Sequence, residues 1–421
     1  MMNPALPSVP SKVGLTHLQE TVAAPTIAHA QTLVSVSVRE APQMTMGVRT
    51  TVLPRIEVKG TQAELVFDGK TRFEKIRVLG EGGLGEVVGA HDHDIGRKVA
   101  IKRLKAEVRS PAALARFVDE IRTIGKLDHP NIIPIHDVGM DETGDLYFVM
   151  KYVEGETLES IIEKLAAGDP QYHRHYTFER RVEIFRSLLE ALAFAHDKGI
   201  IHRDLKPANI MIGKFGEVML MDWGIAKSLC GDTPELPVVS VGAPATPGST
   251  ARAFETQLGA LVGTPLYMAP EQASGLPTDE RSDVYSACMV LCELLYLRHP
   301  FQDKRSLDEV LHAARTEAIR LDLRDIPHQP PVPAELMWFL KHGLEKDPSR
   351  RYPSVRAMLE LLDRRAEGDI RVECPVTAMK QVSIKSTKFI DRHPVVFIGL
   401  TTSFLLLFIA MTVMAVGAMA G

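Results

Sequence analysis

The chain has 421 residues, of which 45% are hydrophobic and 24% charged, and its formal net charge is −4. This length allows two or three domains with hydrophobic cores, and the small negative charge gives no support for nucleic acid as a partner. The cysteines form no CxxC pair, so neither a disulfide framework nor a cysteine metal site is expected, and the central part should lie in a reducing compartment. Met1 to Glu20 lacks a basic start followed by an apolar run, which argues against a signal peptide.

Residues 1–70 are rich in Pro, Thr, Ser, Val and Ala, without a sustained helical or strand period. This composition predicts a flexible leader, although Leu33 to Val38 alternates as a short strand would. A regulatory or docking tail is the alternative, which the many Ser and Thr residues permit without favouring it.

Short strands are predicted from Phe73 onwards. A strand over Lys75–Leu79 is followed by GEGGLGEV, whose glycines would let backbone amides approach phosphate groups. A dinucleotide-binding loop has the same spacing but opens a helix, whereas this run continues into an apolar strand. Another strand holds Val99-Ala100-Ile101-Lys102. Between them, His91–Asp94 is expected to form a solvated turn rather than a metal site.

A helix is predicted to begin at Ser110-Pro111, because serine caps helices and proline suits their first turn. Its apolar face would hold Leu114, Phe117, Ile121 and Ile124. Glu120 lies at the edge of that face, either as a solvated charge or as the partner of a buried cation. Further along, the pattern predicts a strand from Leu146 that leads, within 146–155, into a hinge between two lobes. It then predicts a polar insert over 168–176, a helix over 178–196 and a buried helix opened by Asp283.

The run from Gly199 to Gly224, GIIHRDLKPANIMIGKFGEVMLMDWG, brings carboxylates, a cation and an amide into one short stretch. Its apolar runs, 210–212 and 218–221, flank a Gly-Lys-Phe-Gly turn and predict a hairpin. Asp204 would suit a hydroxyl nucleophile, while Asn209 and Asp222 offer the oxygen ligands that Mg²⁺ prefers.

These runs together resemble the protein kinase family: GxGxxGxV, VAIK, HRDLKPxN, DFG (here DWG), APE at Ala269–Glu271 and the late motif DPSRRY, whose Arg351 would pair with Glu271. The resemblance implies an α+β, bilobal kinase fold over residues 71–365, with a small, mostly β N-lobe (about 71–150) and a larger helical C-lobe (about 154–365). Lys206 and Thr264 are similar to those of serine/threonine kinases. The chain as a whole resembles a membrane-anchored bacterial Hanks-type (Pkn-like) kinase.

The resemblance also implies the role of each site residue. Asp204 would orient the hydroxyl and accept its proton, Lys206 would neutralise the γ-phosphate, and Lys102, paired with Glu120, would hold the other phosphates. Asn209 and Asp222 would bind Mg²⁺. ATP would be bound by Gly80, Glu81, Gly82, Gly83, Leu84, Gly85, Val87, Ala100, Lys102, Met150 (the gatekeeper), Tyr152 and Val153.

A long segment from Ile225 to Met268, rich in Pro, Gly, Ser and Thr, is expected to be the activation loop. In the family, an arginine before the catalytic aspartate, here Arg203, goes with phosphorylation of this loop. The candidate autophosphorylation sites are Thr256, Thr250 and Ser249, and a phosphate there would pair with Arg203. A homodimer would allow this phosphorylation in trans, and Ser/Thr-containing proteins would be the other substrates.

One departure from the family lies at Trp223, which replaces the usual phenylalanine in a stack formed here by Ile124, Ile135, His202 and Trp223. Overpacking a core site can cost about 1–3 kcal/mol. One hypothesis is that Trp223 shifts the balance between active and inactive positions of the magnesium loop. The alternative is a pocket matched to tryptophan.

The end of the chain predicts a membrane anchor. Residues 366–393 would form a basic juxtamembrane linker, with Lys380, Lys385, Lys388 and Arg392. Val395 to Val416 is an uncharged run of 22 residues, about 33 Å as a helix and long enough for a bilayer core. A transmembrane helix over 394–418 is therefore expected, with the kinase domain on the cytoplasmic side of the cell membrane because the basic cluster precedes the span.

The favoured function is an ATP- and magnesium-dependent protein serine/threonine kinase in membrane-associated signalling. A pseudokinase scaffold would be expected to lack Lys102, Asp204 or Asp222, and all three are present. A small-molecule kinase of similar fold would normally lack the APE run and the GTPLY segment, and both are present too.

Overall fold

The computed structural model describes residues 37–38, 50–53, 55–59, 62–66, 69, 71–81, 85–105, 111–141, 144–223, 227–228, 265–321 and 326–420. The chain divides into two compact units, one of Met1–Gln43 with Thr51–Gly69 and one of Met44–Thr50 with Lys70–Gly421. In the first unit, β3 (Gln62–Val66) pairs in parallel with β1 (Ser37–Val38) and antiparallel with β2 (Arg55–Lys59). Strand β1 lies in the alternating run of the predicted leader, whereas β2 and β3 lie where no strand is predicted.

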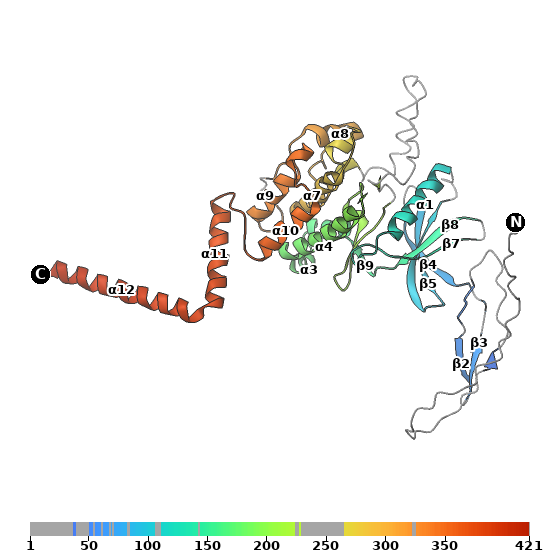
Figure 1. Ribbon diagram of the computed structural model, residues 1–421, viewed down its shortest axis with the longest axis horizontal. Helices are drawn as coiled ribbons and strands as arrows, with labels where there is room; N and C mark the ends of the chain where they lie inside the picture. The colour runs from blue at the N-terminus through green and yellow to red at the C-terminus, as the bar shows by residue number, and fades with distance from the viewer. Residues whose placement is uncertain are drawn as a thin grey trace, which may run out of the picture. The chain divides into compact units, whose positions relative to one another are not determined.

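An antiparallel five-stranded sheet forms the N-lobe of the second unit (Figure 1). Its spatial order is β4-β5-β6-β8-β7, with bounds β4 Phe73–Glu81, β5 Gly85–Asp92, β6 Arg97–Leu104, β7 Ile135–Met140 and β8 Leu146–Lys151. The strands predicted over 75–79, 99–102 and from 146 are confirmed. The glycine-rich run continues into a strand and not a helix, as the kinase resemblance implies.

Helix α1 (Pro111–Gly125) lies beside this sheet (Figure 1) and turns a slightly different face towards it than predicted. Phe117 and Ile124 are buried, but Leu114 is 44% exposed and Ala113 is buried instead. The prediction for Leu114 is wrong because the buried line runs through positions 113, 117, 120 and 124. The same line explains why Glu120 points inward.

The turn at His91–Asp94 is not the solvated turn predicted. The carboxylates of Asp92 and Asp94 are 1% and 3% exposed, and the Arg72 guanidinium lies 3.0 and 3.3 Å from them. Arg72 also contacts Asp137 of β7 at 3.1 Å, so one guanidinium pairs with three carboxylates, two of them at the end of β5 and the turn after it. Buried charges persist when they are paired in this way.

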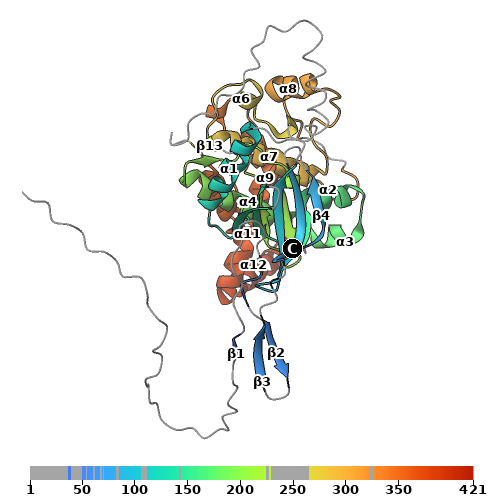
Figure 2. The same cartoon turned by 90° about the vertical axis from the view of Figure 1, so that its right-hand side faces the viewer.

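The C-lobe is helical, and its core forms where α4 (Phe178–Asp197) and α7 (Glu280–Tyr296) pack together (Figure 2). Helix α7 is buried nearly all round. It begins three residues before the predicted Asp283, since Asp279 caps it. The other helices are α2 (Leu158–Ala166), α3 (Pro170–His175), α6 (Pro270–Ala273), α8 (Leu307–Thr316), α9 (Ala334–Gly343) and α10 (Val355–Ala366).

Short elements connect these helices: β9 (Gly155–Thr157), β10 (Ile200–Ile201), η2 (Pro207–Asn209), β11 (Ile210–Gly213), β12 (Val218–Leu220), β13 (Lys227–Ser228), η3 (Pro265–Tyr267) and η4 (Pro348–Arg350). The predicted polar insert contains α3, which begins because Asp169 accepts hydrogen bonds from the backbone of its first turn.

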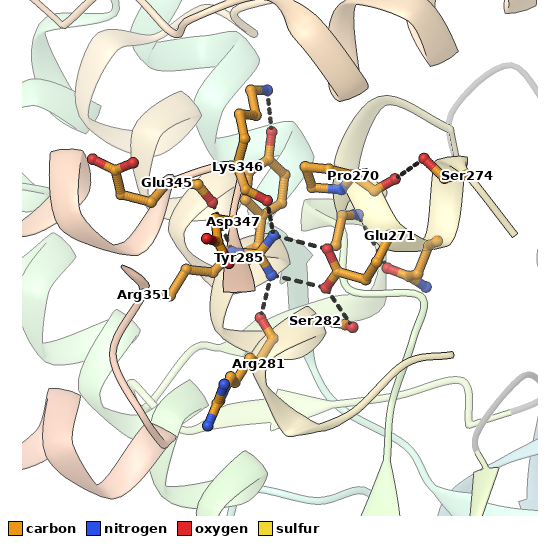
Figure 3. A network of polar contacts seen from close by, with 12 residues as sticks. Pro270, Glu271, Ser274, Arg281, Ser282, Tyr285, Glu345, Lys346, Asp347 and Arg351 are labelled. Carbon is orange, nitrogen blue, oxygen red and sulfur yellow. Dashed lines mark hydrogen bonds and ion pairs between the residues drawn. The ribbon is translucent and has the colours of Figure 1, made fainter. Parts of the chain in front are cut away.

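A buried ion pair joins distant parts of the C-lobe (Figure 3). The two terminal nitrogens of Arg351 each donate to one oxygen of Glu271, at 2.8 Å. Ser282 of α7 donates to the same carboxylate at 2.7 Å, and Arg351 also donates to the carbonyl of Arg281 at 2.9 Å. The pair that the kinase resemblance implies is therefore formed, and it ties α6, α7 and η4 together.

Two helices follow the lobe: α11 (Pro375–Arg392) and α12 (Pro394–Ala420). The segment predicted as a juxtamembrane linker thus contains an 18-residue helix that the sequence did not indicate. Residues Pro394–Met414 of α12 have a mean hydropathy of 2.3 and none of them is buried, so this helix is long and apolar enough to cross a membrane.

Candidate active site

The predicted hairpin brings together the two positions that are predicted to bind a metal. Strands β11 and β12 pair antiparallel, with Ile210 opposite Leu220. The backbone N–H of Met221 donates to the carbonyl of Asn209 at 2.9 Å. Because the hairpin ends are in register, Asn209 and Asp222 leave the sheet at the same end.

Asp204 lies among polar partners at this end. Its carboxylate is 2.9 Å from Lys206 Nζ and accepts a 3.3 Å hydrogen bond from Asn209 Nδ2, which also donates to the Asp204 carbonyl at 2.9 Å. Asp204 is 8% exposed, so its orientation is restricted. Since the amide nitrogen of Asn209 is engaged with Asp204, its carbonyl oxygen is the atom left for a metal.

Lys102 of β6 connects the two lobes electrostatically. Its Nζ is 2.5 Å from Glu120 on α1 and 3.4 Å from Asp222. Burial lowers the pKa of Lys102, but the negative charges of Asp222 and Glu120 outweigh burial and raise it above its ordinary value. The amine therefore stays protonated. Glu120 is buried and paired, so its reading as a solvated charge is wrong.

Asp222 is held as a carboxylate. Burial raises its pKa, but the charges of Lys102 and Lys206 outweigh burial, and the pKa lies below its ordinary value. Its backbone is left-handed, with φ 58°, as is that of Arg203, with φ 68°. Such conformations are uncommon outside glycine and cluster at functional sites.

Asp283 of α7 organises the loop that carries these residues, a role that the sequence analysis missed. Its two carboxylate oxygens accept hydrogen bonds from the backbone N–H groups of His202, at 2.8 Å, and Arg203, at 2.9 Å. His196 of α4 contacts the same carboxylate at 2.7 Å. The sequence feature that could have revealed this role is the position of Asp283 in an otherwise apolar, buried helix, because a buried charge needs partners.

Arg203 itself is half-buried at this loop. Its Nη2 donates to Thr278 Oγ1 at 2.5 Å, and among the described residues no carboxylate forms an ion pair with it. Burial lowers its pKa. The predicted phosphorylation sites Thr256, Thr250 and Ser249 lie outside the described residues.

The predicted ATP-binding residues lie in the N-lobe sheet and just after it. Ala100, Met150 and Val153 are buried, and the Tyr152 hydroxyl accepts a 3.1 Å hydrogen bond from Arg77. Gly85 is required by close packing, because a Cβ there would lie 2.4 Å from the carbonyl oxygen of Arg103. Gly80, Glu81 and Val87 lie on β4 and β5, whereas Gly82, Gly83 and Leu84 lie outside the described residues.

Trp223 is among the largest fully buried side chains, at 1% exposure. Its ring lies 4.5 Å from that of His202, as two neighbours of the predicted stack should. Its Nε1 has no hydrogen-bond partner within the part of the chain that the structure describes. Ile124 is buried and Ile135 half-buried in the same hydrophobic core.

The donor set suits a nucleotide with a divalent cation. Asp222 and the carbonyl oxygen of Asn209 are hard oxygen ligands, and Lys102 and Lys206 supply positive charge for phosphate oxygens. Within the described residues, Lys102, Asp204, Asn209 and Asp222 meet where the N-lobe sheet, α1 and the catalytic loop come together. This is the arrangement that the protein kinase resemblance implies.

The chain belongs to the protein kinase domain family, whose model matches residues 73–361. It is 35% identical over 302 residues to the serine/threonine-protein kinase PknD of Protochlamydia amoebophila, covering 70% of this chain and 30% of that protein. It is 38% identical over 291 residues to the probable serine/threonine-protein kinase SCO3848 of Streptomyces coelicolor, covering 68% and 39%. The chain therefore spans well under half the length of these relatives. They support its place among bacterial Hanks-type serine/threonine kinases.

Proposed function

We propose that the chain is an active protein serine/threonine kinase that transfers the γ-phosphate of ATP, with Mg²⁺, to Ser or Thr hydroxyls of proteins. The observation that carries this proposal is the double contact of Lys102 with Glu120 and Asp222. Phosphoryl transfer by a protein kinase requires the pair of this lysine with a helix glutamate, and it requires the metal-binding aspartate close to the phosphates that the lysine holds. The two contacts of Lys102 support both conditions.

In this proposal each residue acts mainly by position and charge. Asp204 orients the substrate hydroxyl and accepts its proton. Lys206, next to it, neutralises the transferred phosphate, while Lys102 holds the remaining phosphates. Asn209 and Asp222 would hold the Mg²⁺, which supplies charge neutralisation when bound. Asp283 acts indirectly, as a positioning residue, because it fixes the backbone at His202 and Arg203.

Autophosphorylation of the activation segment is part of the proposal. Arg203 is half-buried, and among the described residues its guanidinium donates to a hydroxyl and forms no ion pair with a carboxylate. A phosphate on Thr256, Thr250 or Ser249 would supply the missing anion. Phosphorylation in trans within a homodimer is the simplest route to it.

The proposed domain organisation keeps the predicted boundaries: a leader (1–70), a kinase domain (71–365), a juxtamembrane segment (366–393) and a membrane span (394–418). The length and apolarity of α12 support the span. The basic residues before it favour a single-pass protein of the cell membrane with a cytoplasmic kinase domain. Signalling at the membrane is the function this organisation suggests.

The test is phosphate transfer from radiolabelled ATP by the full chain in detergent, with Mg²⁺ and a generic protein substrate. We expect label on the substrate and on the activation segment, located by mass spectrometry. Asp204→Asn should lose both, whereas Asp303→Asn, an exposed aspartate outside the site, should keep both. Magnesium-dependent ATP binding without any transfer would contradict the proposal and favour a scaffold.

A further inference from the structure

Helix α11 contacts the kinase domain with one face only. Lys380 forms an ion pair with Glu335 of α9, and Lys385 lies 3.5 Å from Asp369. Gln381 donates to the same Asp369 at 3.2 Å. Two more contacts come from this face: Lys388 donates to the carbonyl of Glu367, and Ile384 packs against Gly368. These positions recur every three or four residues, so the charged face of α11 is the docked face.

The opposite face of α11 is apolar and exposed. Val376, Met379, Val382 and Phe389 are 63, 77, 63 and 45% exposed. Their spacing of three, three and seven residues places them along one side of the helix. A cavity of about 400 Å³ lies beneath the docked side, but Gln381 is the residue of α11 that lines it. The apolar side chains are thus turned away from the domain. Apolar residues exposed in such a row indicate an interaction site.

The position of α11 in the chain indicates the partner. It ends at Arg392, and α12, the proposed span, begins at Pro394. His393 breaks the helix, with φ −135° and ψ 57°, because a residue before proline avoids the helical conformation. The two helices can therefore take different directions. An 18-residue helix is about 27 Å long, so an α11 lying flat would bring its whole apolar row to the bilayer surface that α12 enters.

We infer that α11 is an interfacial helix placed between the kinase domain and the lipid bilayer. Its apolar row would enter the headgroup–acyl boundary by about 5–10 Å, while Lys380 and Lys385 stay bound to Glu335 and Asp369. The span alone would leave the kinase domain free to move at the end of a linker, whereas this arrangement holds the α9 side of the C-lobe at the membrane surface. The inference rests on the proposed span.

The test uses the full chain in lipid nanodiscs, with Cys230 and Cys374 replaced by serine. An environment-sensitive fluorophore is attached at one position at a time: Met379→Cys on the apolar row, Lys388→Cys on the docked face, and Phe404→Cys within α12. Quenching by lipids brominated on the acyl chain reports burial in the bilayer, and quenching by iodide reports exposure to water.

We expect strong bromine quenching at positions 379 and 404 and weak bromine quenching at position 388. Iodide should quench the fluorophore at position 379 several times less than it quenches the same fluorophore on a reference peptide that is fully exposed to buffer. Quenching at 404 with free iodide access at 379 would overturn the interfacial placement and leave the span intact. No bromine quenching at 404 would overturn both.

A second copy of the chain is the competing partner for the apolar row. It would protect position 379 from bromine and iodide alike, and oxidation would cross-link two chains carrying Met379→Cys. That result would also overturn the inference. Kinase activity is measured on the same samples, so a failure of the proposed catalytic function is recognised separately.

Discussion

Single buried side chains decide how the catalytic loop is held, and Asp283 is the clearest case. Three groups converge on its carboxylate: the backbone N–H groups of His202 and Arg203, and the ring of His196. Burial raises the pKa of Asp283, but its hydrogen bonds with His196 and with the backbone N–H of Arg203 outweigh burial, so the pKa lies below its ordinary value. The carboxylate is therefore ionised, and each partner fixes part of the loop.

Asp283→Asn should lower the turnover rate by about a hundredfold, because the catalytic loop loses its anchor and small misplacements are costly. The free energy of unfolding should fall by about 2–4 kcal/mol, since charge-assisted buried bonds are lost. Steady-state kinetics and urea unfolding measure the two effects. Asp279→Asn on the same helix is the control, because asparagine caps a helix as well as aspartate. Equal behaviour of the two variants would contradict the anchoring role.

The buried imidazole of His299 should make stability depend on pH. Burial lowers its pKa to about 4, whereas an unfolded histidine has a pKa of about 6.5. Between these values the unfolded chain binds a proton that the folded chain does not, so this contribution to stability is lost as the pH falls. The slope approaches about 1.4 kcal/mol per pH unit.

His299→Asn removes this titration. Its side-chain oxygen should still accept the hydrogen bond that Phe301 N–H now donates to His299 Nδ1 at 3.0 Å. Between pH 7.5 and pH 4.5 the wild type should lose about 2–3 kcal/mol more stability than the variant. Chemical unfolding at several pH values measures the difference. If the free energy of unfolding of the wild type and of the variant changed with pH in parallel, His299 would be protonated equally in the folded and unfolded states.

Trp223→Phe tests whether the tryptophan matters for the magnesium loop. The substitution removes a buried N–H that has no partner among the described residues, and it reduces the volume beside His202. If Trp223 shifts the loop equilibrium, basal activity and nucleotide affinity should both change. Unchanged values, measured by phosphate transfer and equilibrium binding, would support the alternative of a matched pocket.

At the scale of elements, sequence periodicity predicts where several helices lie better than it predicts which residues those helices contact. Helix α1 was expected, but its inward line passes through Ala113 rather than Leu114. Helix α11 was not expected, because its apolar and charged residues suggest a linker until Glu335 and Asp369 are seen to pair with its lysines. Docking of α11 is thus a tertiary property.

Gly368→Ala should loosen α11. The residue has φ 80°, and a Cβ there would lie 2.3 Å from Ile384 Cγ2. Gly275→Ala is a matched control, since Gly275 has φ 68° but no atom within 4 Å of the added carbon. Both variants should be destabilised by about 1–2 kcal/mol, because alanine disfavours the left-handed backbone conformation. Only Gly368→Ala should increase the rate of trypsin cleavage at Lys385 and Lys388 severalfold. Equal cleavage of both variants would show that α11 does not depend on this contact.

At the scale of the whole molecule, a few buried polar contacts connect segments far apart in the chain. Lys102, Glu120 and Asp222 join the lobes, and Arg351 joins Glu271 to the end of the C-lobe (Figure 3). The Lys102–Glu120 and Arg351–Glu271 pairs are largely shielded from water, which makes the loss of one partner costly.

Arg351→Gln should lower the free energy of unfolding by about 3–5 kcal/mol, because Glu271 would remain as a buried, unpaired charge. The adjacent Arg350→Gln is the control. Arg350 is 68% exposed and lies 3.7 Å from Glu345, so its loss should change stability by no more than about 0.5 kcal/mol. Thermal and urea unfolding compare the two. A similar small loss in both would mean that the buried pair contributes little.

The sequence by itself determined the kinase family, the strands at 75–79, 99–102 and from 146, the helices α1, α4 and α7, and the apolar end of the chain. It also predicted Lys102, Glu120, Asp204, Asn209 and Asp222, which the structure brings together in the candidate site. These follow from local patterns, because motif spacing and hydrophobic period are written in consecutive residues. Only the tertiary structure decided the anchoring role of Asp283, the shielding of Asp92 and Asp94 by Arg72, and the docking of α11. Each of these depends on a charge whose partner lies many residues away, and spacing along the chain does not reveal which distant groups folding will bring within hydrogen-bond distance.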